Sequence, residues 1–131
     1  MERLKNKQFI NDLKEFSSWL EKRVRKGILK KNSAVVQKSI VKNWLVQLEK
    51  KRIRDYTDGY LSLRTYKDDV IRRFIEFTES RKMKGKTVTT PFGKGLVDDR
   101  VVVDSSPEVY LKVRLNSGEL VIVPYSLVGE V

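Results

Sequence analysis

Histidine and cysteine are both absent from this sequence of 131 residues. Without them the chain cannot build a Ser/His/Asp or Cys/His nucleophilic site. It also cannot build a zinc finger, an iron–sulfur cluster or a His-ligated iron site. The lack of cysteine excludes a small secreted domain held together by disulfides. These absences predict a binding protein that is not an enzyme and that has no metal or other cofactor.

Long apolar segments are also missing from the chain. A membrane-spanning helix would need about 18 or more consecutive apolar residues. Residues 1–16 mix charged and polar side chains and contain no apolar centre of a signal peptide. We therefore expect an intracellular protein with no membrane segment and no membrane partner.

Positive charge is abundant, and it is unevenly distributed along the chain. The chain has 28 Lys and Arg against 17 Asp and Glu, a net charge of +11. Residues 1–86 contain 24 basic and 11 acidic side chains (+13), and residues 87–131 contain 4 and 6 (−2). The change predicts an α+β protein with two domains. An all-α, basic helical module covers 1–84, a β module covers 87–131, and a short linker near 83–86 joins them.

The basic module is predicted to contain about three main helices. Apolar side chains recur at steps of three and four residues over 9–24, 36–48 and 66–77, which is typical of amphipathic helices. Several aromatic residues lie on these stripes, so we expect them in the core. They are Phe16, Trp19, Trp44, Phe74 and Phe77.

The segment between the second and third helices contains turn-forming residues. Thr57–Gly59 indicates a turn, and Tyr56 and Tyr60 beside it are expected to be free to touch nucleic acid. Thr65–Asp68 has the pattern of a capping box, which would begin the third helix.

The second module is predicted to be a small five-stranded β-barrel. Apolar and polar residues alternate from Val109 to Leu115, which is typical of a half-buried strand. Asn116–Gly118 indicates a hairpin turn, and Leu120–Val123 is the return strand. The remaining β-branched segments bring the number of short strands to about five, which is the size of one small barrel.

The motifs of this module resemble a Tudor- or SH3-like barrel. The opening Pro-Phe-Gly-x-Gly-x-Val at 91–97 is similar to modules at the C-termini of UvrD-type helicases and in CarD-like transcription factors. The resemblance implies a close glycine approach at the first strand, with Phe92 as a plug in the barrel mouth. We expect a protein partner to dock here through Phe92, Tyr110 and Tyr125. The alternative is that these three aromatic side chains form a cage for methyl-lysine.

A segment of the helical module resembles the SAM-like core-binding domain of tyrosine recombinases. Leu61–Thr65 matches its Ser-x-x-Thr helix start, and Asp69–Phe77 matches its Asp-hydrophobic-x-x-Phe stretch. The interval between Thr65 and Asp69 is shorter than in the recombinase pattern. A tyrosine, Tyr66, directly follows Thr65. The recombinase catalytic domain is missing, so the resemblance implies clamping of duplex DNA by basic helices without strand cleavage.

Basic residues at helix ends, turns and helix faces are predicted to contact nucleic-acid phosphates. They are Lys38, Lys42, Lys50, Lys51, Arg52, Arg54, Arg64, Lys67, Arg72, Arg73, Arg81, Lys82 and Lys84. A module with this charge attracts polyanions, and its affinity should fall with salt because binding releases counterions. The interpretation we favour is a non-catalytic accessory protein that recruits a DNA-modifying enzyme, such as a methyltransferase or recombinase, to DNA in the nucleoid or nucleus.

Two other functions stay open on the sequence. One is an RNA-binding or ribosome-associated protein, although the chain lacks the aromatic signature and the GXXG loop of common RNA-binding modules. The other is a protein-interaction scaffold that uses the Tudor-like module alone. Neither requires a small-molecule substrate. The pairs Asp68–Asp69 and Asp98–Asp99 do not predict a metal clamp, because neighbouring side chains on a helix or strand diverge.

Overall fold

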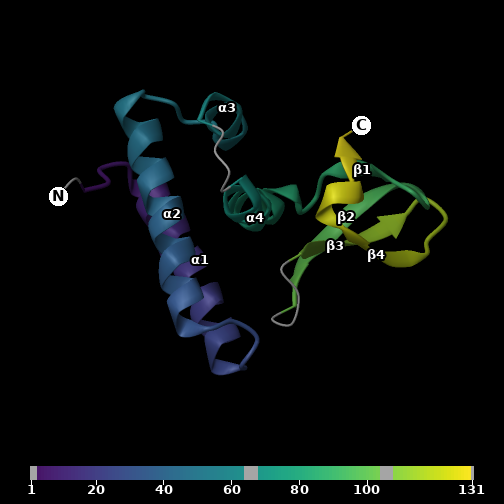
Figure 1. Ribbon diagram of the computed structural model, residues 1–131. Helices are drawn as coiled ribbons and strands as arrows, with labels where there is room; N and C mark the ends of the chain where they lie inside the picture. The colour runs from purple at the N-terminus through teal and green to yellow at the C-terminus, as the bar shows by residue number, and fades with distance from the viewer. Residues whose placement is uncertain (1–2, 64–67, 104–107, 131) are drawn as a thin grey trace. The chain divides into compact units, whose positions relative to one another are not determined.

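The computed structural model describes residues 3–63, 68–103 and 108–130 (Figure 1). The described residues form four α-helices followed by an antiparallel sheet, so the predicted α+β class is confirmed. The chain divides into two compact units, Met1–Ile75 and Glu76–Val131. The boundary between the units falls inside the fourth helix.

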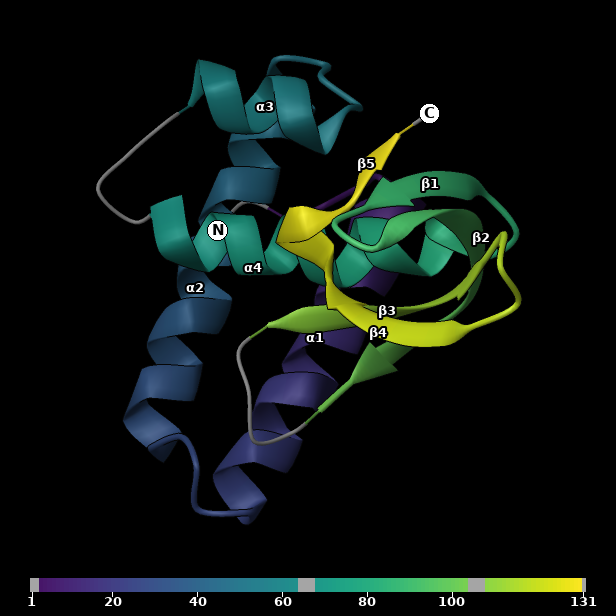
Figure 2. The same cartoon turned by 90° about the vertical axis from the view of Figure 1, so that its right-hand side faces the viewer.

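The first unit contains helices α1 (Lys7–Arg25), α2 (Lys31–Lys50) and α3 (Tyr56–Ser62), and it includes most of α4 (Asp68–Glu79). Helices α1 and α2 are long and antiparallel, and they lie side by side (Figure 2). Polar side chains cap the N-termini of two of these helices by accepting main-chain hydrogen bonds. Asn6 accepts from the N–H of Gln8 at 2.9 Å, and Asp55 accepts from the N–H of Thr57 at 2.8 Å.

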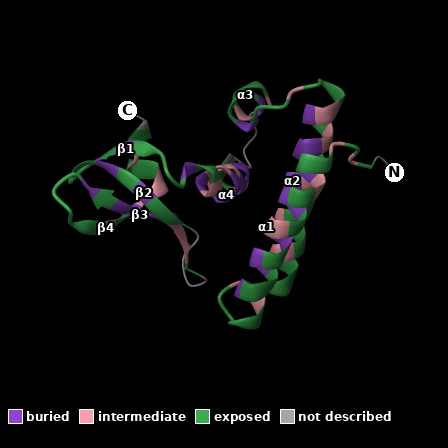
Figure 3. Ribbon diagram, turned by 180° about the vertical axis from the view of Figure 1, so that it is seen from behind, coloured by how far each residue is buried: buried purple, intermediate pink, exposed green. Residues whose placement is uncertain are grey.

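The core of the first unit is an aromatic cluster centred on Phe74. The Phe74 ring has no exposed surface and lies edge-on to Phe16 of α1, with ring centroids 5.4 Å apart. It also lies edge-on to Trp44 of α2 at 5.9 Å and to Tyr56 of α3 at 5.4 Å. Such contacts contribute beyond the apolar area that they bury. The buried residues of these helices are shown in Figure 3. All five aromatic residues that were predicted in the core are buried, so that prediction is confirmed.

The predictions for the segment before α4 are wrong in two respects. Thr57–Gly59 is not a turn between helices, because it lies within α3. Tyr56 is not free to touch nucleic acid, because it is only 1% exposed. The cause is tertiary packing. A Cβ atom on Gly59 would lie 2.3 Å from a methyl carbon of Leu48, so only glycine lets α3 approach α2 this closely. Most of the predicted capping box, residues 65–67, lies outside the described residues.

The second unit is an antiparallel sheet with the strand order β4-β3-β2-β1-β5. Its strands are β1 (Thr87–Thr90), β2 (Gly93–Val102), β3 (Val109–Leu115), β4 (Leu120–Pro124) and β5 (Gly129–Glu130). The 3₁₀ turns η1 (Ser80–Met83) and η2 (Tyr125–Leu127) precede β1 and β5. Four strands form most of the sheet, and a fifth is present only if the two-residue β5 is counted. The described pairings join β5 to β1 and β4 to β3 and do not close a barrel.

The core of the sheet lies on one face and includes Met83, the first residue of the predicted linker. The buried side chains are those of Met83, Val88, Val97, Leu111, Val113 and Leu115, which confirms the alternation predicted for β3. The main chain of Gly85 donates to the carbonyl of Val97 at 2.9 Å. The segment 83–86, which composition marks as a linker, is therefore tied to the second unit by the buried Met83 side chain and by main-chain hydrogen bonds of Gly85 and Lys86 with Val97.

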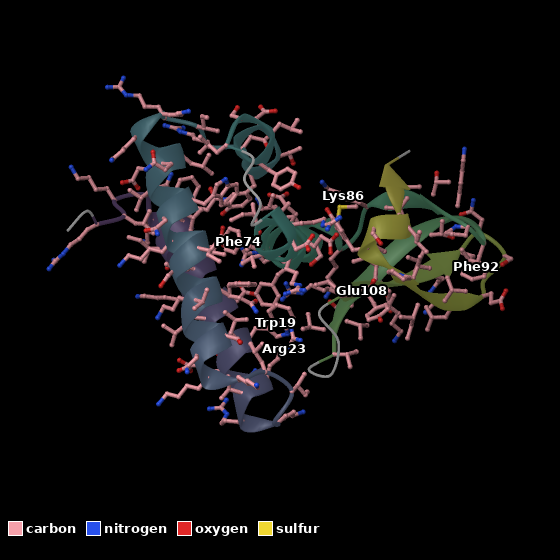
Figure 4. All side chains as sticks on the ribbon, in the orientation of Figure 1. Trp19, Arg23, Phe74, Lys86, Phe92 and Glu108 are labelled. Carbon is pink, nitrogen blue, oxygen red and sulfur yellow. The ribbon has the colours of Figure 1, made fainter. Side chains whose placement is uncertain are left out.

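Phe92 does not plug the mouth of a barrel, because 64% of its surface is exposed. It lies in the turn between β1 and β2, at the end of the sheet (Figure 4). The Thr90 hydroxyl accepts from the Phe92 N–H at 3.1 Å and donates to the Gly93 carbonyl at 2.8 Å. These hydrogen bonds hold the turn in a conformation that leaves the Phe92 ring exposed.

Candidate nucleic-acid interface

The net charge of the protein belongs to its first unit. Residues 1–75 carry 20 Lys and Arg and 9 Asp and Glu, which gives 20 − 9 = +11. Residues 76–131 carry 8 of each, which gives 8 − 8 = 0. Any attraction of a polyanion by net charge therefore acts through the helical unit.

Four of the predicted phosphate contacts lie at the C-terminal end of α2 and are exposed. They are Lys50, Lys51, Arg52 and Arg54, which we call the α2-end cluster. The main chain turns sharply at this point. Arg52 donates from its N–H to the carbonyl of Glu49 at 3.0 Å and has a left-handed φ of 58°. Together, the last residue of α2, the turn and the residues after it present four cations within five residues.

Glu49 is the single acidic residue of α2, and its carboxylate is occupied by main-chain hydrogen bonds. It accepts from the N–H of Lys5 at 2.9 and 2.8 Å and from the N–H of Asn6 at 2.6 Å. These bonds hold the segment before α1 against the end of α2. The exposed side chains of Lys5 and Lys7 therefore belong to the same end of the helix pair as the α2-end cluster.

Lys38 and Lys42 lie in a different place, beside a groove between α1 and α2. Two hollows of about 410 and about 400 Å³ share Ser17, Glu21 and Lys38, so they form one continuous depression. The basic residues that line the depression are Arg3, Lys14, Arg25, Lys31, Lys38 and Lys42. We call this depression the α1–α2 groove.

The remaining predicted contacts are scattered. Arg72 on α4 is 2.5 Å from Asp69 in an exposed ion pair, and Arg73 follows it on the same helix. In the second unit, Lys82 pairs with Glu79 at 3.6 Å, within the segment that also contains Arg81 and Lys84. Exposed pairs of this kind are weak, so they do not prevent contact with phosphates. Arg64 and Lys67 lie outside the described residues.

Sequence reasoning missed Arg3, Lys14, Arg25 and Lys31 as neighbours of Lys38 and Lys42. Part of the signal was available, because Lys31, Lys38 and Lys42 are spaced by seven and four residues and share one stripe of α2. Arg3 gave no such signal, since it precedes the helix. Its position follows from the hydrogen bonds of Glu49 to the neighbouring main chain.

The three residues predicted to contact a protein partner do not share one site. Phe92 lies in the turn next to Gly93, whereas Tyr110 is paired with Val101, eight residues further along β2. Phe92 and Tyr110 therefore lie near opposite ends of the ten-residue strand β2. Tyr125 is partly buried against the core of the sheet. These three rings therefore do not come together as a cage for methyl-lysine.

The outer face of the sheet exposes apolar residues that sequence reasoning did not select. Leu96 of β2 and Leu120 of β4 both pair with Arg114 of β3, so the three lie in one row. Ile122, which is 59% exposed, lies beside Lys112 in the next row. Alternation did indicate that these positions face outward. It did not indicate that apolar residues would gather there.

No protein-family model, curated protein or solved structure matches the chain. The two family resemblances therefore rest on the quoted residues alone. Within the described residues, no group of three or more Asp and Glu side chains is placed to hold a metal ion. None of the described helices is both long enough and apolar enough to cross a bilayer.

Proposed function

We propose that this chain is a non-catalytic DNA-binding accessory protein, whose first unit binds the phosphates of duplex DNA through the α2-end cluster. The observation that supports this most strongly is the position of the charge. The whole net charge of +11 resides in the helical unit, and the four cations of the α2-end cluster are all exposed. The one acid of α2 is turned to the main chain of residues 5 and 6.

The physical basis is counterion release. Each phosphate neutralised by Lys or Arg makes the negative slope of log K against log salt steeper by about 0.9. Cations at a helix C-terminus also interact favourably with the helix dipole, which is a purely structural reason for one or two of them. That reason does not extend to Arg54, which follows the turn. A role in binding accounts for all four.

The second unit is proposed to dock the protein partner, an enzyme that modifies DNA. An SH3-like barrel is a meander whose last strand returns beside the first. The order β4-β3-β2-β1-β5 and the 3₁₀ turn before β5 support that finer assignment. The unit has no net charge, so it would not compete with the helical unit for DNA. Such a protein would act at the nucleoid or in the nucleus.

Charge reversal with a matched control tests the DNA-binding part. The test variant is K50E/K51E/R54E, which leaves Arg52 in its turn. The control is K86E/K94E/R114E, which reverses three exposed cations of the second unit and changes the net charge by the same amount. Binding to a fluorescent DNA duplex is measured by anisotropy at several salt concentrations.

We expect the test variant to lose most of its affinity and its salt slope to fall by about 2.7, which corresponds to three phosphate contacts. The control variant should bind like the wild-type protein, apart from a small loss common to any change in net charge. Equal losses in the two variants would contradict the assignment to the α2-end cluster. A clear preference for structured RNA in direct competition would contradict the choice of duplex DNA.

A further inference from the structure

The described residues of the first unit cover one long face of the helix pair α1–α2. Phe74 of α4 packs against Phe16 of α1 and Trp44 of α2 on the covered face. The α1–α2 groove lies on a different face, lined by residues such as Lys14 and Lys38. Its hollows fall within the size range of about 300–1,000 Å³ that is typical of ligand sites.

The floor of the groove is apolar. Helix α1 contributes the half-buried Ile10 and the buried Leu13 and Leu20, and helix α2 contributes Val35, which is 58% exposed. The small side chains of Ser17 and Ala34 also line the hollows, where larger residues would reduce their volume. The part of this floor that remains exposed, on Ile10 and Val35, gains free energy when another apolar surface covers it.

The walls of the groove are basic. Six cations line it, and Glu21 is the single acidic residue among its lining residues. The cations come from both helices and from the segment before α1. A ligand that lies in the groove would therefore meet positive charge on both sides of an apolar strip.

We infer that the α1–α2 groove binds an acidic amphipathic helix from a partner protein. An amphipathic helix places apolar residues at i, i+3, i+4 and i+7 into a hydrophobic groove and keeps its polar residues at the edges. From Ile10 to Val24 the groove follows α1 for about 21 Å, the length of about four helical turns. Glutamate or aspartate at the edges of such a helix complements the basic walls.

An apolar floor favours this ligand over nucleic acid. A phosphate backbone would satisfy the cations, but it has no apolar face that would cover Ile10 and Val35. The inference is independent of the proposed function, because DNA is assigned to the α2-end cluster. The groove would be a second site, and DNA and the helix would bind at the same time.

The test uses the full chain and a designed probe. The probe is a capped peptide of about 18 residues, because shorter helices are marginal in water, with Leu on one face and Glu on the other. A second peptide has the same composition in a shuffled order that gives no apolar face. A third carries Lys in place of Glu. Binding of each labelled peptide is measured by fluorescence anisotropy.

We expect the amphipathic acidic peptide to bind at least tenfold more tightly than either control peptide. K31E/K38E/K42E and, separately, V35D should each reduce its affinity at least tenfold. These positions are on the surface or edge of α2, and a far-UV circular dichroism spectrum checks that each variant remains helical. K50E/K51E/R54E, which changes the net charge by the same amount as K31E/K38E/K42E, should cause only the small loss of peptide affinity common to any such change.

Three results would overturn the inference. The first is equal binding of the shuffled and amphipathic peptides, which would indicate charge attraction alone. The second is peptide binding that is insensitive to V35D. The third is loss of duplex DNA affinity in K31E/K38E/K42E as large as in K50E/K51E/R54E, together with displacement of the peptide by DNA. That result would make the groove part of the nucleic-acid site.

Discussion

The hydroxyl of Tyr56 donates a hydrogen bond to the carboxylate of Asp12, and both side chains are only 1% exposed. The two residues lie 44 positions apart and connect α3 to α1. A carboxylate is costly to bury unless hydrogen bonds satisfy it. The contact therefore requires α3 to pack at one place on α1, and it makes this polar pair part of the core.

Removal of the Tyr56 hydroxyl should destabilise the first unit. In Tyr56→Phe the buried Asp12 carboxylate loses this donor, and we expect the free energy of unfolding to fall by about 1–3 kcal/mol. Urea denaturation followed by tryptophan fluorescence measures the change, since Trp44 lies 6.1 Å from the Tyr56 ring. The same substitution in an Asp12→Asn background should cost less, because the neutral amide is less costly to leave without a donor. Additive losses would show that the two side chains are not coupled.

Substitution by alanine should change the free energy of unfolding greatly at Phe74 and very little at Phe92. Phe74→Ala removes the centre of the aromatic cluster, and we expect a loss of about 3–5 kcal/mol in the free energy of unfolding. Phe92→Ala removes an exposed ring and should change it by less than about 0.5 kcal/mol. Thermal unfolding by circular dichroism compares the two variants. A large loss from Phe92→Ala would contradict the exposed position of that ring.

The amphipathic stripes predicted the long helices and the aromatic core well, because the spacing of Phe9, Phe16 and Trp44 is a local property of the sequence. Helix α3 could not be predicted in this way. Thr57–Gly59 favours a turn by propensity, and the helix depends on the Asp55 cap and on the contact between Gly59 and Leu48. The sequence alone does not show that Gly59 and Leu48 are in contact, so neither residue by itself indicates that α3 is a helix.

The candidate site was predictable only in its chemical nature. The charge count indicated a polyanion-binding surface, and the run Lys50–Arg54 already stood together in the sequence. The α1–α2 groove was not predictable, because its walls come from two antiparallel helices and from Arg3. The exposure of Phe92 was missed because it depends on the hydrogen bonds of the Thr90 hydroxyl, which a motif does not reveal.

Gly95 should tolerate no side chain. A Cβ atom at this position would lie 2.5 Å from the carbonyl oxygen of Arg114 on β3, and a backbone atom cannot move aside as a side chain can. We expect Gly95→Ala to lower the stability of the sheet by about 1–3 kcal/mol, the usual cost of overpacking. Gly129→Ala is the matched control, because nothing lies within 4 Å of its Cβ position. Chemical denaturation should show a shift of the midpoint for the first variant alone.

Replacement of Arg52 by glycine should raise the stability of the protein and lower its affinity for DNA. Its φ of 58° is left-handed, which costs a residue other than glycine about 1–2 kcal/mol, and glycine is the usual residue at this position after a helix. We therefore expect Arg52→Gly to raise the free energy of unfolding by about 0.5–1 kcal/mol, the gain being reduced by the greater freedom of glycine in the unfolded chain.

The same variant should bind DNA more weakly, because it loses one of the four cations of the α2-end cluster. The salt slope of duplex binding should fall by about 0.9. Arg52→Ala removes the charge and keeps the unfavourable φ, so it should lose affinity equally without any gain in stability. Urea denaturation and salt-dependent anisotropy on the three proteins separate the two effects. If Arg52→Gly gained stability and kept full affinity, Arg52 would not contact phosphate, and the cluster would be reduced to the three remaining cations.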